Sequence, residues 1–227
     1  MIVLALDTAG IDCSVAVYDA TSDRMLSIQT EMIGKGHAER LMALIEAAVA
    51  DAGLALSNID RIAVTIGPGS FTGIRVGVAA ARGFALSLGI EAVGVTTLET
   101  MATHQLAAAG GHPVIAAMDA RRGEIYAQPF AADGTPLEEA QALPPEAVTL
   151  LATLHGATVF GTGAVAIAAA AAGEIPQAGV KTVPDRFDIA TVAKLGAAKP
   201  QGSEKPKPLY LRGPDAKPQL GFALARS

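Results

Sequence analysis

The sequence predicts an α/β protein of two similar lobes, each with a mixed sheet flanked by helices. The first observation is the order of elements in residues 2–95, where three predicted strands are followed by helices that alternate with strands. The second is a glycine-rich turn, residues 67–77, between a predicted strand and a long apolar helix. The third is a weaker repetition of the opening pattern from Ala117 onward.

The opening strand is a continuous apolar run, residues 2–6, that ends at Asp7. Two alternating strands follow over 13–18 and 25–30, and the short turns between them imply an antiparallel meander. Apolar periodicity predicts a helix over 37–52, which Gly53 ends. Strands over 61–66 and 92–95 complete the half, on either side of the helix that ends near Leu88. This order is that of the ribonuclease H-like half-domain of the actin-like (ASKHA) superfamily, which contains sugar kinases, actin and heat-shock ATPases.

The glycine turn has two interpretations. A helix that begins after such a turn can bind an anion, because its first N–H groups are unpaired. Alternatively, the glycines only let the helix pack tightly on the sheet. A P-loop needs Gly-Lys-Ser/Thr and a dinucleotide fingerprint needs an earlier third glycine, so neither motif fits and close packing is favoured. Ser70 or Thr72 can cap the helix. The predicted structural loop comprises Gly67, Pro68, Gly69, Ser70 and Gly73.

The helix after this turn is apolar over most of its surface, and Arg75, Arg82 and Ser87 form its polar stripe. Such a helix is normally buried on more than one side. Gly69, Gly73 and Gly77 recur every four residues, so if the helix begins early enough two of them form a smooth ridge that another helix could approach. Either the helix is covered by its own chain, or a helix of another subunit covers part of it.

The second half repeats the pattern in a degenerate form. An apolar strand ends at Asp119 and a strand returns over 125–127; then come a helix over 144–154, a strand over 158–160 and a helix over 163–172. We therefore predict a first lobe at 1–105, a second lobe at 106–198 and a Pro/Lys-rich C-terminal segment at 199–227. Residues 209–214 are expected to dock back onto the body.

Composition narrows the function. The chain has 227 residues, is 51% hydrophobic and carries a net charge of −5, which argues against a large nucleic-acid footprint of its own. The single cysteine, Cys13, predicts no disulfide framework, and the opening apolar run stops too early for a leader peptide. The apolar run 164–172 is too short to cross a membrane. We expect a cytoplasmic protein without a membrane partner.

Few residues suggest chemistry. The ends of the opening strands of both halves correspond to the phosphate hairpins of actin-like ATPases, although Arg121, Arg122 and Glu124 would crowd a nucleotide in the second. The histidines have no second ligand at helix spacing and Cys13 has no local histidine partner, so we predict neither a metal site nor a catalytic residue. The candidate nucleotide-binding residues are Asp7, Thr8, Ser14 and Asp119.

Five stretches together resemble the TsaB (YeaZ) family over nearly the whole chain. They are residues 6–9, 13–16, 67–77, 117–126 and 210–212. This family is the bacterial partner subunit for making threonylcarbamoyladenosine in tRNA. Its catalytic sibling, TsaD, has a His-x-x-x-His metal pair on the first-lobe helix. Here His37 is followed by Leu41 at the second position, which places the chain on the non-catalytic side of the resemblance.

The resemblance implies a scaffold without a cofactor of its own, with a nucleotide expected at the complex interface. It implies pairing with TsaD, joined by the ATPase TsaE, and self-pairing when TsaD is absent, with tRNA engaged indirectly through the complex. The two first-lobe helices are the expected contact surface. The predicted interface residues are Leu41, Leu44, Ile45, Arg75, Val76, Ala79 and Arg82.

Two other classes stay open. One is an independent actin-like nucleotide-binding ATPase or kinase-like enzyme, which the fold permits but which fold alone does not establish. The other is a protease, which requires a metal pair or a nucleophile constellation that the sequence lacks.

Overall fold

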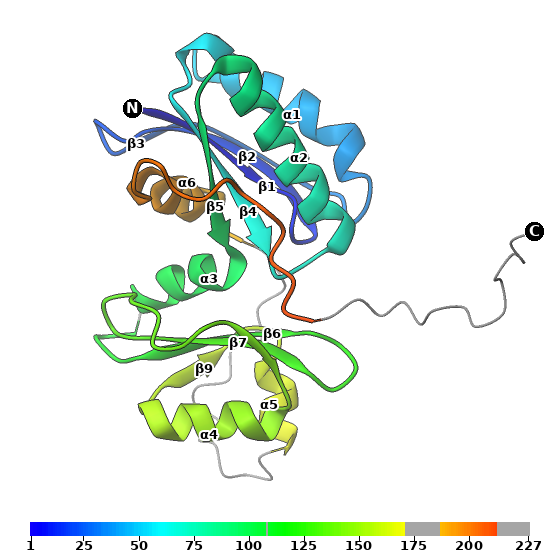
Figure 1. Cartoon of the computed structure of the whole chain (residues 1–227), viewed down its shortest axis with the longest axis vertical. Helices are drawn as coiled ribbons and strands as arrows, with labels where there is room; N and C mark the ends of the chain where they lie inside the picture. The colour runs from blue at the N-terminus through cyan, green and yellow to red at the C-terminus, as the bar shows by residue number, and fades with distance from the viewer. Residues whose placement is uncertain (108, 171–186, 213–227) are drawn as a thin grey trace, which may run out of the picture.

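The structure is a computed structural model that describes residues 1–107, 109–170 and 187–212. Two lobes lie one above the other, with α3 (Thr97–Leu106) between them (Figure 1). The upper lobe holds β1–β5, α1, α2 and α6, and the lower lobe holds β6–β9, α4 and α5. The predicted two-lobe actin-like fold is confirmed.

The first lobe is built on a five-stranded sheet in the order β3-β2-β1-β4-β5. Strands β1, β2 and β3 form the predicted antiparallel meander, whereas β4 and β5 run parallel to β1. The strands are β1 (Ile2–Asp7), β2 (Asp12–Asp19), β3 (Arg24–Met32), β4 (Arg61–Gly67) and β5 (Glu91–Thr96). The helices are α1 (His37–Asp51), α2 (Phe71–Leu88) and α6 (Ile189–Ala198), with a 3₁₀ turn at Leu56–Asn58.

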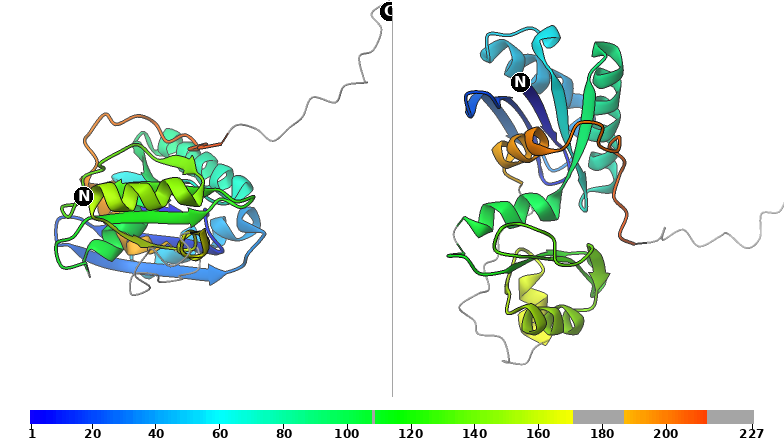
Figure 2. Two further views of the ribbon diagram at one scale, coloured as in Figure 1. Left: turned by 90° about the horizontal axis from the view of Figure 1, so that it is seen from below. Right: turned by 60° about the vertical axis from the view of Figure 1, so that its left-hand side comes forward.

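Helices cover both faces of this sheet. Successive side chains of a strand point to opposite faces, so Leu4 and Leu6 pack with α1 and α2, whereas Val3 and Ala5 pack with α6. Figure 2 shows α6 on the face of the sheet away from α1 and α2. The double cover explains why the opening strand reads as an unbroken apolar run rather than an alternating one.

The second lobe has a four-stranded sheet in the order β8-β7-β6-β9. Its β6–β7 hairpin is antiparallel, like β1–β2 in the first lobe. Strand β9 runs parallel to β6, as β4 runs parallel to β1, and this shared pattern confirms the duplication. The sequence did not predict β8, α3 or α6. The strands are β6 (Val114–Asp119), β7 (Ile125–Phe130), β8 (Gln141–Leu143) and β9 (Thr158–Phe160); the helices are α4 (Pro145–His155) and α5 (Ala164–Ala170).

The predicted lobe boundary at residue 198 is wrong, because α6 belongs to the first lobe. Gly196 lies so close to β4 that an added Cβ would be 2.2 Å from the Cβ of Ala63. The buried Arg61 donates hydrogen bonds to the carbonyl oxygens of Gly196, Ala197 and Lys199, at 3.2, 3.2 and 2.7 Å. The first lobe is therefore made of two separate parts of the chain.

The C-terminal segment docks back as predicted, as far as Arg212; residues 213 and 214 lie outside the described part. The backbone N–H of Leu209 donates to the carbonyl oxygen of Ile66 at 2.8 Å. Arg212 forms an ion pair with Glu124 of the second lobe. The segment thus touches both lobes.

Gly69, Gly73 and Gly77 do not form a ridge for another helix, contrary to the prediction. An added Cβ on Gly73 would lie 1.9 Å from the carbonyl oxygen of Thr8, and one on Gly77 would lie 2.4 Å from the Thr8 hydroxyl. On Gly69 it would lie 2.4 Å from the carbonyl oxygen of Ala9. All three glycines face the β1–β2 hairpin. A side chain at any of these positions would collide with Thr8 or Ala9, so only glycine leaves room for the hairpin.

This contact yields a test within one helix. Gly73→Ala is expected to lower the free energy of unfolding by at least about 2 kcal/mol, because the hairpin must move to admit the methyl group. Gly83→Ala is the matched control: nothing lies within 4 Å of its added Cβ, so alanine should stabilise the helix by about 0.5–1 kcal/mol. Urea unfolding measures both, and equal effects would contradict the packing described.

Candidate functional site

The tip of the β1–β2 hairpin packs against the glycine turn through Thr8 and Ala9. The Thr8 hydroxyl donates to the carbonyl oxygen of Gly73 at 2.7 Å, and the N–H of Ser70 donates to the carbonyl oxygen of Ala9 at 2.7 Å. Ser70 also caps α2, because its Oγ accepts from the N–H of Gly73 at 3.2 Å. These polar groups of the turn are bonded to the hairpin or to one another. The close-packing interpretation of the turn is therefore confirmed.

Asp7 is a buried carboxylic acid at the base of this hairpin. Its Oδ1 accepts from the Thr65 hydroxyl at 2.6 Å and from the N–H of Ala9 at 3.0 Å, whereas its Oδ2 has no hydrogen-bond partner among the described residues. Burial, with a smaller contribution from the charge of Asp12, raises the pKa of Asp7 to about 6.

The four candidate nucleotide-binding residues do not line one site. Asp7 and Thr8 are completely buried; Thr8 lies under α2, whereas Asp7 points to the opposite face of the sheet, where it bonds to Thr65. Asp119 is exposed, and its Oδ1 accepts from the N–H of Arg121 at 2.7 Å. Ser14 alone of the four lines the cavity between the lobes. Nucleotide binding stays a prediction that these contacts do not support.

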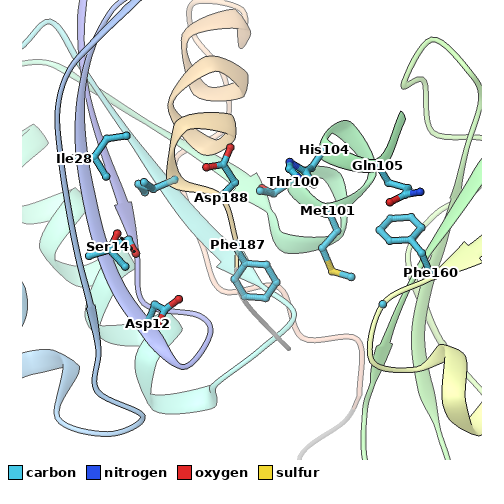
Figure 3. Close-up of a pocket in the computed structure, with 13 residues that line it drawn as sticks. Asp12, Ser14, Ile28, Thr100, Met101, His104, Gln105, Phe160, Phe187 and Asp188 are labelled. Atoms are coloured by element: carbon cyan, nitrogen blue, oxygen red, sulfur yellow. Dashed lines mark hydrogen bonds between the residues drawn. The ribbon is translucent and has the colours of Figure 1, made fainter. Parts of the chain in front are cut away.

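The cavity between the lobes has a volume of about 360 Å³. Figure 3 shows Asp12, Ser14 and Ile28 of the first sheet on one side and Phe160 of the second lobe on the other. Helix α3 and the start of α6 supply the remaining walls. The lining residues are Asp12, Ser14, Ile28, Thr30, Thr100, Met101, His104, Gln105, Phe160, Gly161, Phe187, Asp188 and Ile189.

The three predicted contact residues on α1 do not lie on the surface of this chain. Leu41, Leu44 and Ile45 are only 0, 4 and 2% exposed, because they form the stripe with which α1 packs into the core of its own lobe. On α2 the prediction fits better, since Arg75, Ala79 and Arg82 are exposed and Val76 is half-buried.

Sequence reasoning missed the two large apolar residues of this face. Phe71 and Leu86 are 58 and 86% exposed, and they lie on the same side of α2 as Arg75, Ala79 and Arg82. We call these five residues the α2 stripe. The helical spacing of Phe71 and Leu86 from the predicted arginines could have revealed them.

Arg75 is held in place within this stripe. Its guanidinium carbon lies 3.5 Å from the centroid of the Phe71 ring, and its Nε donates to the Tyr210 hydroxyl at 2.8 Å. The C-terminal segment therefore fixes one end of the α2 stripe.

Nothing in the described ranges assembles a metal centre: they contain no group of three or more His, Cys, Asp or Glu side chains that could hold an ion. His37 is buried, with its Nε2 3.1 Å from the carbonyl oxygen of Asp12. Burial, chiefly, raises the pKa of the Cys13 thiol to about 11, which makes it a poor nucleophile at neutral pH.

Helix α2 is the one described helix that has the length and composition to cross a membrane, at 18 residues. The core helix of a soluble protein passes the same test, so this is weak evidence for a span. The cytoplasmic location stays a prediction.

The duplicated lobes, the paired hairpins and the cavity between them define a two-lobed protein of the actin-like class. A family model described as "TsaD: tRNA N6-adenosine threonylcarbamoyltransferase" matches residues 24–194. The solved structure of YeaZ from Pseudomonas aeruginosa superimposes with a TM-score of 0.74 at 31% identity, covering 92% of this chain and 99% of that one. The chain belongs to the TsaB (YeaZ) family.

Curated relatives agree with this assignment. The chain is 38% identical over 126 residues to the tRNA threonylcarbamoyladenosine biosynthesis protein TsaB of Escherichia coli K12, covering 56% of this chain and 53% of the relative. The protein of the same name from Bacillus subtilis is 34% identical over 129 residues, with 56 and 53% covered. The chain thus spans about half the length of the curated relatives that it matches.

The buried Asp7 predicts an unusual pH dependence. Because its folded-state pKa, about 6, lies above its ordinary value of 3.8, the stability linked to its proton is complete below about pH 4 and is lost as the pH rises through 6. Relative to Asp7→Asn, the wild-type free energy of unfolding should fall by roughly 2–3 kcal/mol between pH 4 and pH 7.

Chemical denaturation at several pH values measures this difference. Asp133→Asn provides the contrast, because hydrogen bonds from Thr135 lower the pKa of the exposed Asp133 and reverse the sign of the pH dependence. A wild-type to Asp7→Asn difference that is constant with pH would contradict the burial argument.

Proposed function

We propose that this protein is a non-catalytic partner subunit that pairs with a TsaD-type protein through the α2 stripe. The single observation that carries the proposal is this stripe. It exposes Phe71 and Leu86, residues that are normally buried, along a helix whose opposite face is fixed to its own lobe. Exposed apolar residues that share one helix face with arginines are typical of protein–protein contacts.

The charge pattern of the stripe suits a protein contact. Arg75 and Arg82 flank Ala79, a small exposed residue that lets a partner helix come close. Met42, on helix α1, is also exposed. Arginine and methionine are enriched in interfaces, since the guanidinium plane stacks and the thioether adapts to its neighbours.

The family assignment indicates the reaction in which the complex would take part. Relatives are named for tRNA threonylcarbamoyladenosine biosynthesis, and the matching family model is named for threonylcarbamoyl transfer to tRNA adenosine. In this proposal TsaD performs the transfer to the adenosine next to the anticodon, TsaE joins the complex, and tRNA is engaged through it. The chain pairs with itself when TsaD is absent, and any nucleotide sits at the complex interface rather than on this chain alone.

Three observations support the non-catalytic role. The hairpin that corresponds to the phosphate hairpin of ATPases is buried under α2, with Thr8 bonded to Gly73. The Cys13 thiol is protonated and enclosed. The described His37 is bonded to backbone rather than directed at a metal partner.

The proposal is tested by placing a charge on the stripe. Leu86→Glu and Ala79→Glu should each reduce co-purification with the TsaD of the same organism by at least about tenfold, because a buried unpaired carboxylate costs several kcal/mol. Leu150→Glu is the matched control, since Leu150 of α4 is 71% exposed on the other lobe. Melting temperatures verify that all three variants fold.

Reconstituted tRNA modification, with and without this chain, provides the second readout. The stripe variants should lose the stimulation that the wild type gives, and Leu150→Glu should retain it. Unchanged pull-down in the stripe variants would reject this surface. ATP hydrolysis by the isolated chain that disappears in Asp7→Ala would instead support the independent enzyme.

A further inference from the structure

A second hollow of the molecule lies between the end of α2 and the C-terminal segment. It has a volume of about 710 Å³ and is lined by α2, the turn into β5 and the stretch 202–206. We call it the α2 groove. In Figure 1 the C-terminal segment, orange to red, runs from α6 past β5 and on toward the second lobe. Arg82 and Leu86 belong both to the α2 stripe and to the lining of this groove.

Part of the α2 groove is apolar. Leu86 is 86% exposed, although leucine is normally buried. The described lining residues also include Ala85, Ile90 and Pro206. Nothing lies within 4 Å of a Cβ added to Gly83, so α2 leaves open space on this side. An exposed leucine beside open space is typical of a surface that a partner covers.

The wall formed by the C-terminal segment is fixed to the sheet. The N–H of Gly202 donates to Oε1 of Glu91 at 2.8 Å, and Oε2 of the same carboxylate accepts from Nη2 of Arg61 at 2.7 Å. Arg61 also holds the carbonyl oxygens at the end of α6. Because this wall is already positioned, little conformational entropy is lost when a partner binds to it.

Two cations of the α2 groove have no counter-charge. The side chains of Arg82 and Lys205 form neither an ion pair nor a hydrogen bond with any residue that the structure describes. Glu91 is the one acid among the described lining residues, and Arg61 already neutralises it. The described lining therefore carries two positive charges, one from α2 and one from the C-terminal segment.

Lys205 differs from the other lysines within residues 199–212. Lys199 pairs with Glu99 at 2.8 Å, and Lys207 pairs with Glu204. Lys205 lies between these two pairs in the sequence, is exposed and lines the groove. A lysine without a described partner at the edge of an apolar groove is placed to meet a carboxylate of another protein.

We propose that the α2 groove receives an acidic segment of the TsaD-type partner. Its carboxylates pair with Arg82 and Lys205, and an apolar side chain beside them packs against Leu86. The inference rests on the proposed function, because a partner that covers the α2 stripe reaches the groove through the residues that the two surfaces share. It adds the C-terminal segment to the contact and gives the partner's surface there a negative charge.

Carbodiimide coupling of the purified complex tests which group faces Lys205, since the reagent joins an amine to a carboxylate only where the two are in contact. Mass spectrometry should find Lys205 linked to an aspartate or glutamate of the TsaD of the same organism. Lys207 is the internal control and should be linked to Glu204 of its own chain. A linked Lys207 without a linked Lys205, or a link from Lys205 only to a second copy of this chain, would overturn the proposal.

Reversal of the charge at Lys205 measures how much the contact contributes to binding. In low salt, Lys205→Glu should bind TsaD about five- to tenfold more weakly, because an attractive charge pair becomes a repulsive one, and the difference should shrink in high salt. Lys205→Arg should bind like the wild type. Lys194→Glu is the matched control, because it changes the net charge equally but lies on α6, on the opposite face of the sheet (Figure 2). It should bind TsaD like the wild type, and melting temperatures verify that each variant folds.

The outcomes separate this inference from the proposed function. If Ala79→Glu abolishes the complex and Lys205→Glu binds TsaD like the wild type, the inference is rejected and the proposed function stands. If Ala79→Glu also binds TsaD like the wild type, both are rejected. Weaker self-association of Lys205→Glu with unchanged TsaD binding would assign the groove to a second copy of this chain, and would likewise reject the inference.

Discussion

The burial of the β1–β2 hairpin under the start of α2 is the contact on which the rest of the first lobe depends. Thr8 and Ala9 occupy the space that side chains at positions 69, 73 and 77 would otherwise fill. The contact joins β1 to α2, and with it fixes which side of α2 faces outward. It has a cost, because Asp7 at its base is buried with one oxygen unpaired among the described residues. In return for burying Asp7, the contact holds the outer stripe of α2 in a defined position.

The same contact separates two surfaces with different chemistry. On one face of the first sheet, α2 presents arginines and exposed apolar residues. On the other face, the sheet, α3, α6 and the second lobe enclose a cavity whose walls include Phe160 and Phe187. In a working ATPase of this class the hairpins would hold phosphate between the lobes. Here the first hairpin is covered by its own helix, and neither Asp7 nor Thr8 lines the cavity between the lobes.

Much of the fold could be predicted from sequence because its signals are local. The apolar run that ends at Asp7, the glycine turn with its Ser70 cap and the helix over residues 37–52 needed no knowledge of distant contacts. What failed was long-range. Leu41, Leu44 and Ile45 form an apolar stripe equally suited to the core or to a partner, and only the packing of α1 decides between them. Helix α6 could not be assigned to the first lobe, since nothing in its sequence identifies Ala63 as the neighbour of Gly196.

The assignment of α6 to the first lobe has a consequence for synthesis on the ribosome. Domains form as units while the chain emerges, N-terminal parts first. Here the surface of Val3, Ala5 and Ala63 receives its cover only from residues 189–198, after the whole second lobe has been translated. During that interval a nascent chain displays an uncovered apolar sheet face, a target for chaperones. Helix α6, made after the second lobe, thus completes the first lobe to be made.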